Sequence, residues 1–218
     1  MKITLYYFKI PFWRAEVTRL SLFIADIPFD DHRIGGDEYD EFKKTGKLPN
    51  GKIAPFKQLP VLEVDGKIFA QTGAIARYCG KLSGLYPKND DYKSALIDQI
   101  IEAAQDINFL VTLSGRDKDP EKKRVAREIL ATRHLPKWFQ YLENLNNQND
   151  QSVFFVGKYL TIADLAIWRL LGWLTSGLLD GVPMNILEPY KRLKKLREEI
   201  YNNPKVNEWM IKTYGKII

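Results

Sequence analysis

Residues 54–72, APFKQLPVLEVDGKIFAQT, decide the fold of this chain. Two short apolar runs flank the pair Asp65-Gly66, a dipeptide typical of the tight turn between two antiparallel strands. Pro60 stands where the first run begins, and a residue without an N–H is tolerated there. The stretch therefore predicts a β-hairpin. Leu59, just before the proline, would keep its backbone groups free for another partner, such as the backbone of a ligand.

A helix is expected directly after the hairpin. Ile75, Tyr78, Cys79 and Leu82 share one face of a helical pattern that starts at Thr72. Threonine is a common N-cap, and the N-terminus of a helix attracts carboxylates. We therefore predict a helix capped by Thr72, whose start could bind a ligand carboxylate. The alternative is that the hairpin and capped helix are purely structural.

The residues before the hairpin predict a strand, a helix and a second strand. Residues 3–8 have strand character, and residues 14–25 form an apolar belt wider than a surface helix needs. Residues 31–34 favour a second strand, residues 37–44 a short helix, and residues 45–56 a loop without apolar periodicity. The resulting order, βαβ and then ββα, is that of a thioredoxin-like domain.

The second half of the chain shows helical periodicity throughout. We predict helices at residues 92–114, 121–145, 162–175, 190–201 and 205–213. The fold class is then α/β plus all-α: a thioredoxin-like domain at 1–83, a linker at 84–90 and an all-helical domain at 91–218.

One helix start has a clear signature. Thr161 is followed three residues later by Asp164 and then by an apolar run, which is the pattern of a capping box. We expect this motif to stabilise the fold and to have no part in chemistry.

Composition excludes several classes of protein. The chain has 218 residues, 45% of them apolar, and a net charge of +6, which allows a substantial core and an anionic substrate. Its basic residues are mixed with acids and are not interleaved with aromatics, so no nucleic-acid partner is expected. No apolar run is long enough for a membrane span, and the N-terminus does not resemble a signal peptide. The single cysteine, Cys79, lies on an apolar face, and a cytoplasmic protein is expected.

Metal and nucleotide sites are not expected either. His32 and His134 are the only histidines, and neither has a ligand spacing with the other or with Cys79. A histidine-based catalytic triad is equally unsupported. The pair Gly35-Gly36 lacks the lysine and the helix of a phosphate-binding loop.

Several short motifs, in this order, resemble those of the cytosolic glutathione transferases. The Tyr-Phe start and the LEVDG hairpin are most similar to the sigma, mu, pi and alpha group, with sigma closest. The likeness continues into the second half and covers nearly the whole chain. The motifs are ITLYYF at 3–8, RAE at 14–16, QLP at 58–60, EVDG at 63–66, QT at 71–72, AIARY at 74–78, QD at 105–106 and GKYLTIAD at 157–164.

The resemblance implies glutathione as co-substrate and a tyrosine that activates its thiol. A free thiol has a pKa of about 8.5, so the reactive thiolate is the minor form at neutral pH. The Tyr7-Phe8 pair matches the family, and its tyrosine hydroxyl would stabilise the thiolate with electrostatic help from Arg14. Tyr6 is the alternative, and adjacent strand residues point to opposite faces.

The resemblance also implies contacts along the whole of glutathione. Gln71 and Thr72 would hold the γ-glutamyl end, and the backbone of Leu59, beside a cis Pro60, would pair with the cysteine. Asp106 of a second subunit would contact the γ-glutamyl amine, which implies a homodimer. Three residues would hold the glycyl end: Tyr39, Lys43 and Gln58. Thr72 stands where the family usually has serine, and Tyr39 where sigma-like members commonly have tryptophan.

A second pocket would take an apolar electrophile. Its expected wall is the turn at residues 9–13, which is one residue longer than the family turn and lacks its usual Arg-Gly, together with part of the helical domain. The candidate residues are Ile10, Phe12, Trp13, Phe109 and Leu113. The opposing interpretation is that these aromatic and aliphatic residues belong to the core.

Three functions fit the sequence. The first is a detoxifying transferase that conjugates the glutathione thiolate to small apolar electrophiles. A glutathione-dependent isomerase, similar to the prostaglandin D synthases of the sigma class, would use the same thiolate. A non-catalytic binding or structural protein on the same fold, similar to lens crystallins, is the third, and the retained tyrosine argues against it.

Overall fold

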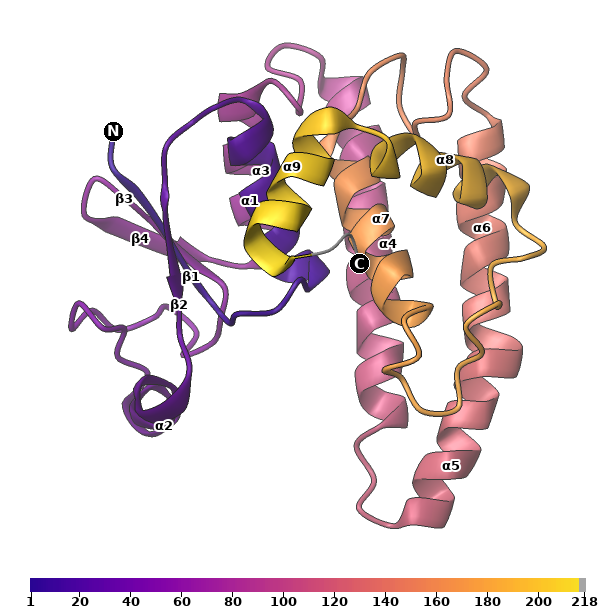
Figure 1. The fold of residues 1–218 in the computed structure, drawn as a ribbon, viewed down its shortest axis with the longest axis horizontal. Coiled ribbons are helices and arrows are strands. Elements are labelled where there is room, and N and C mark those ends of the chain that lie inside the picture. The colour runs from indigo at the N-terminus through magenta and orange to yellow at the C-terminus, as the bar shows by residue number, and fades with distance from the viewer. Residues whose placement is uncertain (216–218) are drawn as a thin grey trace.

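A four-stranded mixed sheet forms the N-terminal half of the chain (Figure 1). The structure, a computed structural model, describes residues 1–215. Its strands are β1 (Ile3–Tyr7), β2 (Asp30–Arg33), β3 (Val61–Val64) and β4 (Lys67–Ala70), in the spatial order β2-β1-β3-β4. β1 and β2 run parallel, and the other two pairs are antiparallel. The predicted βαβ and ββα units and the thioredoxin-like fold are confirmed.

The hairpin has the geometry that its turn dipeptide requires. Asp65 and Gly66 both have positive φ, 47° and 81°, as in the turns that match the twist of paired strands. The backbone N–H of Lys2 donates to the Asp65 carboxylate at 2.7 Å, which ties the turn to the start of β1. The register pairs Val61 with Ala70, so the predicted hairpin is confirmed.

The sheet is covered by helices on both faces. α1 (Trp13–Ile24) and α3 (Thr72–Ser83) pack on one face, and their contact residues include the fully buried Cys79. α2 (Gly36–Thr45) lies on the other face (Figure 1), where Phe42 is buried. Cys79 is thus a core thiol as predicted, and burial raises its pKa to about 12.

The opposite side of α1 packs against the helical half. Val17 and Leu20 are fully buried in the largest core, which continues into α7 (Ile162–Leu174). This explains why the apolar belt of α1 is wider than a surface helix needs. The expected linker at 84–90 lies between α3 and α4, yet Tyr86 within it is buried in the same core. The division into two domains at this segment remains an inference.

The second half is helical, as predicted (Figure 1). Besides α7 its elements are α4 (Asp91–Ser114), α5 (Pro120–Ile129), a π-helical segment η1 (Leu130–His134), α6 (Leu135–Asn147), α8 (Lys191–Tyr201) and α9 (Pro204–Tyr214). The prediction of one helix over 121–145 is wrong, because η1 interrupts it. Pro136 has no N–H for the regular ladder, and this perturbs the turn before it.

The loop at 45–56 is tied down. An isolated bridge joins Lys47 and Ile53, and Leu48 and Ala54 are buried under the sheet. These anchors hold the segment that leads to Pro60.

The capping box is confirmed. The Thr161 backbone N–H donates to Oδ2 of Asp164 at 2.7 Å, and the Phe155 N–H donates to Oδ1 at 2.8 Å. Burial raises the pKa of Asp164 to about 6, and these hydrogen bonds oppose that rise. The motif stabilises the start of α7, as the sequence predicts.

Within residues 1–215, no helix is both long enough and apolar enough to cross a membrane.

Candidate functional site

A depression lies at the entrance to the hairpin. It is formed by the start of α1, the loop before β3, and the junction of β4 with α3. Six of the residues expected to bind glutathione or assist catalysis meet here, together with Phe56 and Ala70, which the sequence did not single out. The lining residues are Arg14, Phe56, Gln58, Leu59, Pro60, Ala70, Gln71 and Thr72. The Leu59-Pro60 bond is cis, as the resemblance implies.

The start of α3 differs from the prediction in one respect. The N-cap is Gln71 and not Thr72, because Thr72 is already the first helical residue and its side chain points inward. Gln71 has φ 77° and ψ 121°, a conformation that L residues rarely adopt and that is often found at ligand-binding sites. Thr72 is 1% exposed, and its hydroxyl has no hydrogen-bond partner among the described residues. A ligand oxygen at the helix N-terminus would satisfy this donor.

Tyr7 ends β1 on the face covered by α1 and α3. It is 4% exposed, and burial raises its pKa to about 12, while the charges of Arg14 and Arg19 act in the opposite direction. The hydroxyl is therefore protonated at neutral pH. No hydrogen bond among residues 1–215 engages it, so it is free to donate.

Tyr6 faces the opposite side of the sheet, and its hydroxyl is occupied. It donates to Glu63 at 3.0 Å and accepts from Asn50 at 3.1 Å. Lys52 completes this network with an ion pair to Glu63 at 2.6 Å. Of the two adjacent tyrosines, only Tyr7 has a hydroxyl available for a ligand.

The residues expected at the glycyl end lie partly outside the depression. Tyr39, on α2, packs edge-on against Phe8 with ring centres 5.0 Å apart, next to the end of β1. The Lys43 ammonium lies 4.9 Å from the centre of the Tyr39 ring and pairs with Asp40 at 2.9 Å. Asp106 is exposed on α4 and is not among the lining residues.

Of the residues expected to line the electrophile pocket, all but Trp13 have exposed or half-buried side chains. Ile10, Phe109 and Leu113 are 45%, 60% and 41% exposed, so their side chains are accessible to a ligand. Phe12 is half-buried and packs edge-on against Trp173, with ring centres 4.8 Å apart. These four remain candidates for the wall of an apolar pocket.

Trp13 does not belong to that wall. Its side chain has no exposed surface and lies in the core between the two halves. Its Nε1 donates to Asn108 on α4 at 3.4 Å, so the ring holds α1 against that helix.

Two family models match the chain. One described as glutathione S-transferase, N-terminal domain, matches residues 3–81, and one described as glutathione S-transferase, C-terminal domain, matches residues 106–213. This chain belongs to the glutathione S-transferase family. Together with named transferases among its relatives, these matches show that it is a transferase enzyme with glutathione as co-substrate.

Individual relatives support this membership over nearly the full length. A glutathione S-transferase of Plasmodium yoelii yoelii is 33% identical, covering 90% of this chain and 88% of the relative. The hematopoietic prostaglandin D synthase of Gallus gallus is 31% identical, covering 91% and 90%. The solved structure of prostaglandin synthase D of Nilaparvata lugens superposes with a TM-score of 0.82 at 27% identity, covering 97% and 98%.

The structure of this glutathione transferase also reveals residues that sequence reasoning missed. Glu16 and Arg19 are fully buried charges on α1 that contact the turn after Tyr7 and the last helix. Their signal in the sequence was two opposite charges three residues apart inside an apolar belt. Such a pair is usually a surface feature, and only the packing of α9 shows that it is buried.

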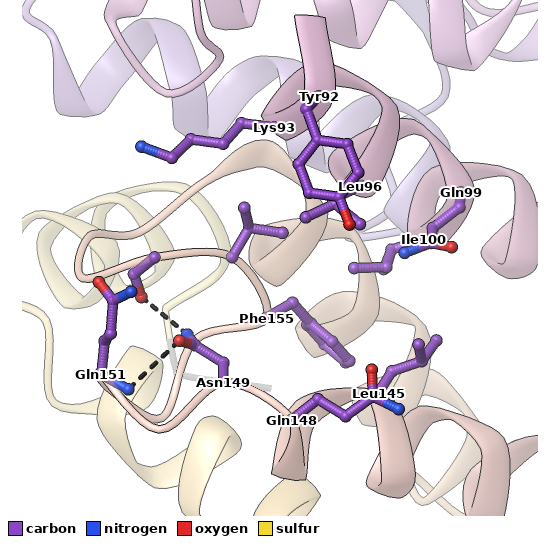
Figure 2. A pocket seen from close by; sticks show the side chains of 12 residues that line it. Tyr92, Lys93, Leu96, Gln99, Ile100, Leu145, Gln148, Asn149, Gln151 and Phe155 are labelled. Atoms are coloured by element: carbon purple, nitrogen blue, oxygen red, sulfur yellow. Dashed lines mark hydrogen bonds between the residues drawn. The ribbon is translucent and has the colours of Figure 1, made fainter. Parts of the chain in front are cut away.

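A second hollow of this enzyme lies at the start of α4 and the end of α6 (Figure 2). Its loop side is held by Asn149, whose side chain donates to the carbonyl of Gly157 at 2.8 Å and accepts from the N–H of Gln151 at 3.3 Å. The Lys93 ammonium at its edge lies 3.5 Å from Asp90. Asn149 and Lys93 are thus engaged within the fold, and none of the residues of this hollow lines the depression at the hairpin entrance.

Proposed function

We propose that this enzyme activates the thiol of bound glutathione with the hydroxyl of Tyr7. The observation that carries the proposal is a buried, protonated and unpaired tyrosine hydroxyl beside Arg14, on the sheet face that carries α1 and α3. A donor aimed at sulfur stabilises the thiolate, and the nearby Arg14 charge acts in the same direction. The thiol proton is released to solvent, and the sulfur forms a bond to the electrophile as its leaving group departs.

Glutathione would be held by the start of α3 and the loop before β3. The γ-glutamyl carboxylate would accept from the buried Thr72 hydroxyl and the N-terminal N–H groups of α3, next to the strained Gln71. The Leu59 backbone would pair with the cysteine. Tyr39, Lys43 and Gln58 would meet the glycyl carboxylate; of these only Gln58 lines the depression, and Lys43 would then exchange Asp40 for the ligand.

The electrophile would be small and apolar. Ile10 and Phe12 of the turn, with Phe109 and Leu113 of α4, have exposed or half-buried apolar side chains that would form its wall. We place this enzyme in the sigma class, in a cytoplasmic detoxifying role, on the Tyr7-Phe8 pair and on its similarity to hematopoietic prostaglandin D synthase.

A glutathione-dependent isomerase is the second candidate. It is favoured by the similarity to two prostaglandin D synthases, one of them with a TM-score of 0.82. An isomerase would use the same Tyr7 and the same thiolate, but the sulfur would leave the product again at the end of the cycle.

The consumption of thiol distinguishes the two functions. The enzyme is incubated with glutathione and an apolar aryl halide, or with the precursor of prostaglandin D, while product and free thiol are followed together. Conjugation removes one thiol per product, whereas isomerisation leaves the thiol concentration constant. A protein that binds to immobilised glutathione but supports neither reaction would contradict an enzymatic function.

We further propose a two-fold homodimer in which Asp106 completes the partner's glutathione site. Asp106 is exposed on α4, and its carboxylate would accept a hydrogen bond from the γ-glutamyl amine. Asp106→Ala should raise the KM for glutathione about tenfold while leaving turnover at saturation unchanged, since a hydrogen bond to a charged group is lost. Asp150→Ala, which removes another exposed carboxylate, is the matched control.

Sedimentation velocity at micromolar concentration checks the dimer itself. A fully active monomer, or an unchanged KM in Asp106→Ala, would contradict the shared site.

A further inference from the structure

The turn between β1 and α1 is held by a buried pair of charges. The side chains of Glu16 and Arg19 have no exposed surface, and Nη1 of Arg19 lies 3.2 Å from Oε2 of Glu16. A buried ion pair is costly unless additional hydrogen bonds complete it. The position of this pair therefore depends on the groups that surround it.

Arg19 donates hydrogen bonds to the backbone that follows Tyr7. Its Nη2 donates to the Phe8 carbonyl at 3.0 Å, and its Nη1 donates to the Ile10 carbonyl at 3.1 Å. Its Nε donates to Asp31 at 2.9 Å, which fixes the guanidinium plane. The guanidinium carbon lies 5.9 Å from the centre of the Tyr7 ring. Arg19 thus sets the path of the chain just after Tyr7 and brings a positive charge close to its ring.

Tyr214, in the last turn of α9, contacts both members of the pair. Its hydroxyl donates to Oε2 of Glu16 at 2.6 Å and accepts from Nη1 of Arg19 at 3.3 Å. Trp209, on the same helix, donates its Nε1–H to the other oxygen of Glu16. Figure 1 shows α9 lying beside α1. The C-terminal helix α9 is therefore linked to the turn after Tyr7 both through the Glu16 carboxylate and directly through Arg19.

The surroundings of the pair keep Tyr214 in its donating form. Burial, together with the Glu16 carboxylate, raises the pKa of Tyr214 well above its usual value, so the hydroxyl is protonated at every pH of an assay. Arg33 lies 5.4 Å from the centre of the Tyr214 ring, and Arg169 donates to the Pro11 carbonyl at 2.7 Å. Among residues 1–215, the charged and titratable groups that contact Arg19 are Tyr7, Glu16, Asp31 and Tyr214. Further charges act on these neighbours: Arg14 on Tyr7, Arg33 on Tyr214, and Arg169 close to Glu16.

We propose that Tyr214 is a positioning residue for thiol activation, holding the turn after Tyr7 in place through Glu16 and Arg19. The inference rests on the proposed role of Tyr7. Without the Tyr214 hydroxyl, Glu16 loses one of its donors and Arg19 loses one of its acceptors, so the guanidinium moves toward the carboxylate. The Phe8 and Ile10 carbonyls then move with it, and the Tyr7 hydroxyl aligns less well with the glutathione sulfur.

The test is Tyr214→Phe, which removes one oxygen and keeps the ring. We expect the pKa of bound glutathione, read from thiolate absorbance against pH, to rise by about half to one unit. Turnover at pH 6.5 should fall about three- to tenfold, with the dissociation constant for glutathione unchanged. Tyr201→Phe, on α8 and 50% exposed, is the matched control and should titrate as wild type.

A double-variant comparison tests the route through Arg19. Arg19→Lys keeps the charge but loses the planar fork that reaches the two carbonyls. In the Arg19→Lys background, Tyr214→Phe should cause no further change in the pKa of bound glutathione. Additive shifts would overturn the route, and if Arg19→Lys does not fold, the single variant Tyr214→Phe still decides the proposal.

The outcomes separate this inference from the proposed function. A Tyr214→Phe protein that melts at a lower temperature but titrates its bound thiol as wild type has lost only a structural contact, and the inference is overturned. If Tyr7→Phe still raises the pKa of the bound glutathione thiol in that case, the proposed function stands. If wild type itself does not lower the thiol pKa, it is the proposed function that fails.

Discussion

Tyr7→Phe is expected to lower turnover at pH 7 between tenfold and a thousandfold, because about one to three pKa units of thiol activation are lost. Glutathione affinity should stay nearly unchanged, since the carboxylate contacts are made elsewhere. The pH profile of kcat should move upward by the same number of units. Steady-state kinetics between pH 5.5 and 9 measure both effects.

Tyr6→Phe is the control for this prediction. The Tyr6 hydroxyl is bound to Glu63 and Asn50 on the other face of the sheet, so its loss should leave the pH profile in place. If the two variants have the same pH profile, Tyr7 is not the activating group, and Arg14 or a backbone N–H becomes the better candidate.

The second large effect is expected from Thr72→Val. The substitution keeps the shape of the side chain and removes the unpaired hydroxyl of a residue that lines the depression. A charge-assisted hydrogen bond to the γ-glutamyl carboxylate is worth roughly 1.5–3 kcal/mol, so the dissociation constant should rise roughly ten- to a hundredfold by calorimetry.

Thr72→Val should leave the stability of the ligand-free protein unchanged or raise it, although it weakens glutathione binding. The Thr72 hydroxyl is buried without a partner, and removing such a group is neutral or stabilising when no ligand is bound. Thr18→Val is the matched control, because the Thr18 hydroxyl is also buried and unpaired but lies within α1, outside the depression. Equal glutathione affinities of the two variants would remove Thr72 from the site.

Local signals in the sequence were sufficient for the hairpin and for the prediction that Tyr6 and Tyr7 face opposite sides of the sheet. The Asp65-Gly66 turn and the alternation of strand side chains are determined by a few neighbouring residues, and both appear in the structure as expected. The capping box at Thr161 and Asp164 is of the same kind. Each depends on backbone geometry within about five residues.

Features that depend on distant packing were not predictable in this way. Trp13 was expected in a pocket, but its partner Asn108 lies 95 residues away and the ring is buried between α1 and α4. The contact of Tyr214 with Glu16 spans 198 residues. Thr72 was expected as a cap, but it is the first helical residue of α3 and its side chain is buried, and burial is decided by tertiary structure. A local pattern contains none of this information.

The central claim is that the site favours the thiolate over the thiol, and the most direct measurement is the ultraviolet absorbance of enzyme-bound glutathione against pH. A free thiol has a pKa of about 8.5, and we expect the bound thiol of the wild-type enzyme to titrate at least one unit lower. This lowering should be lost in Tyr7→Phe and kept in Tyr6→Phe. A wild-type complex whose thiol titrates at the value of free glutathione would contradict the account.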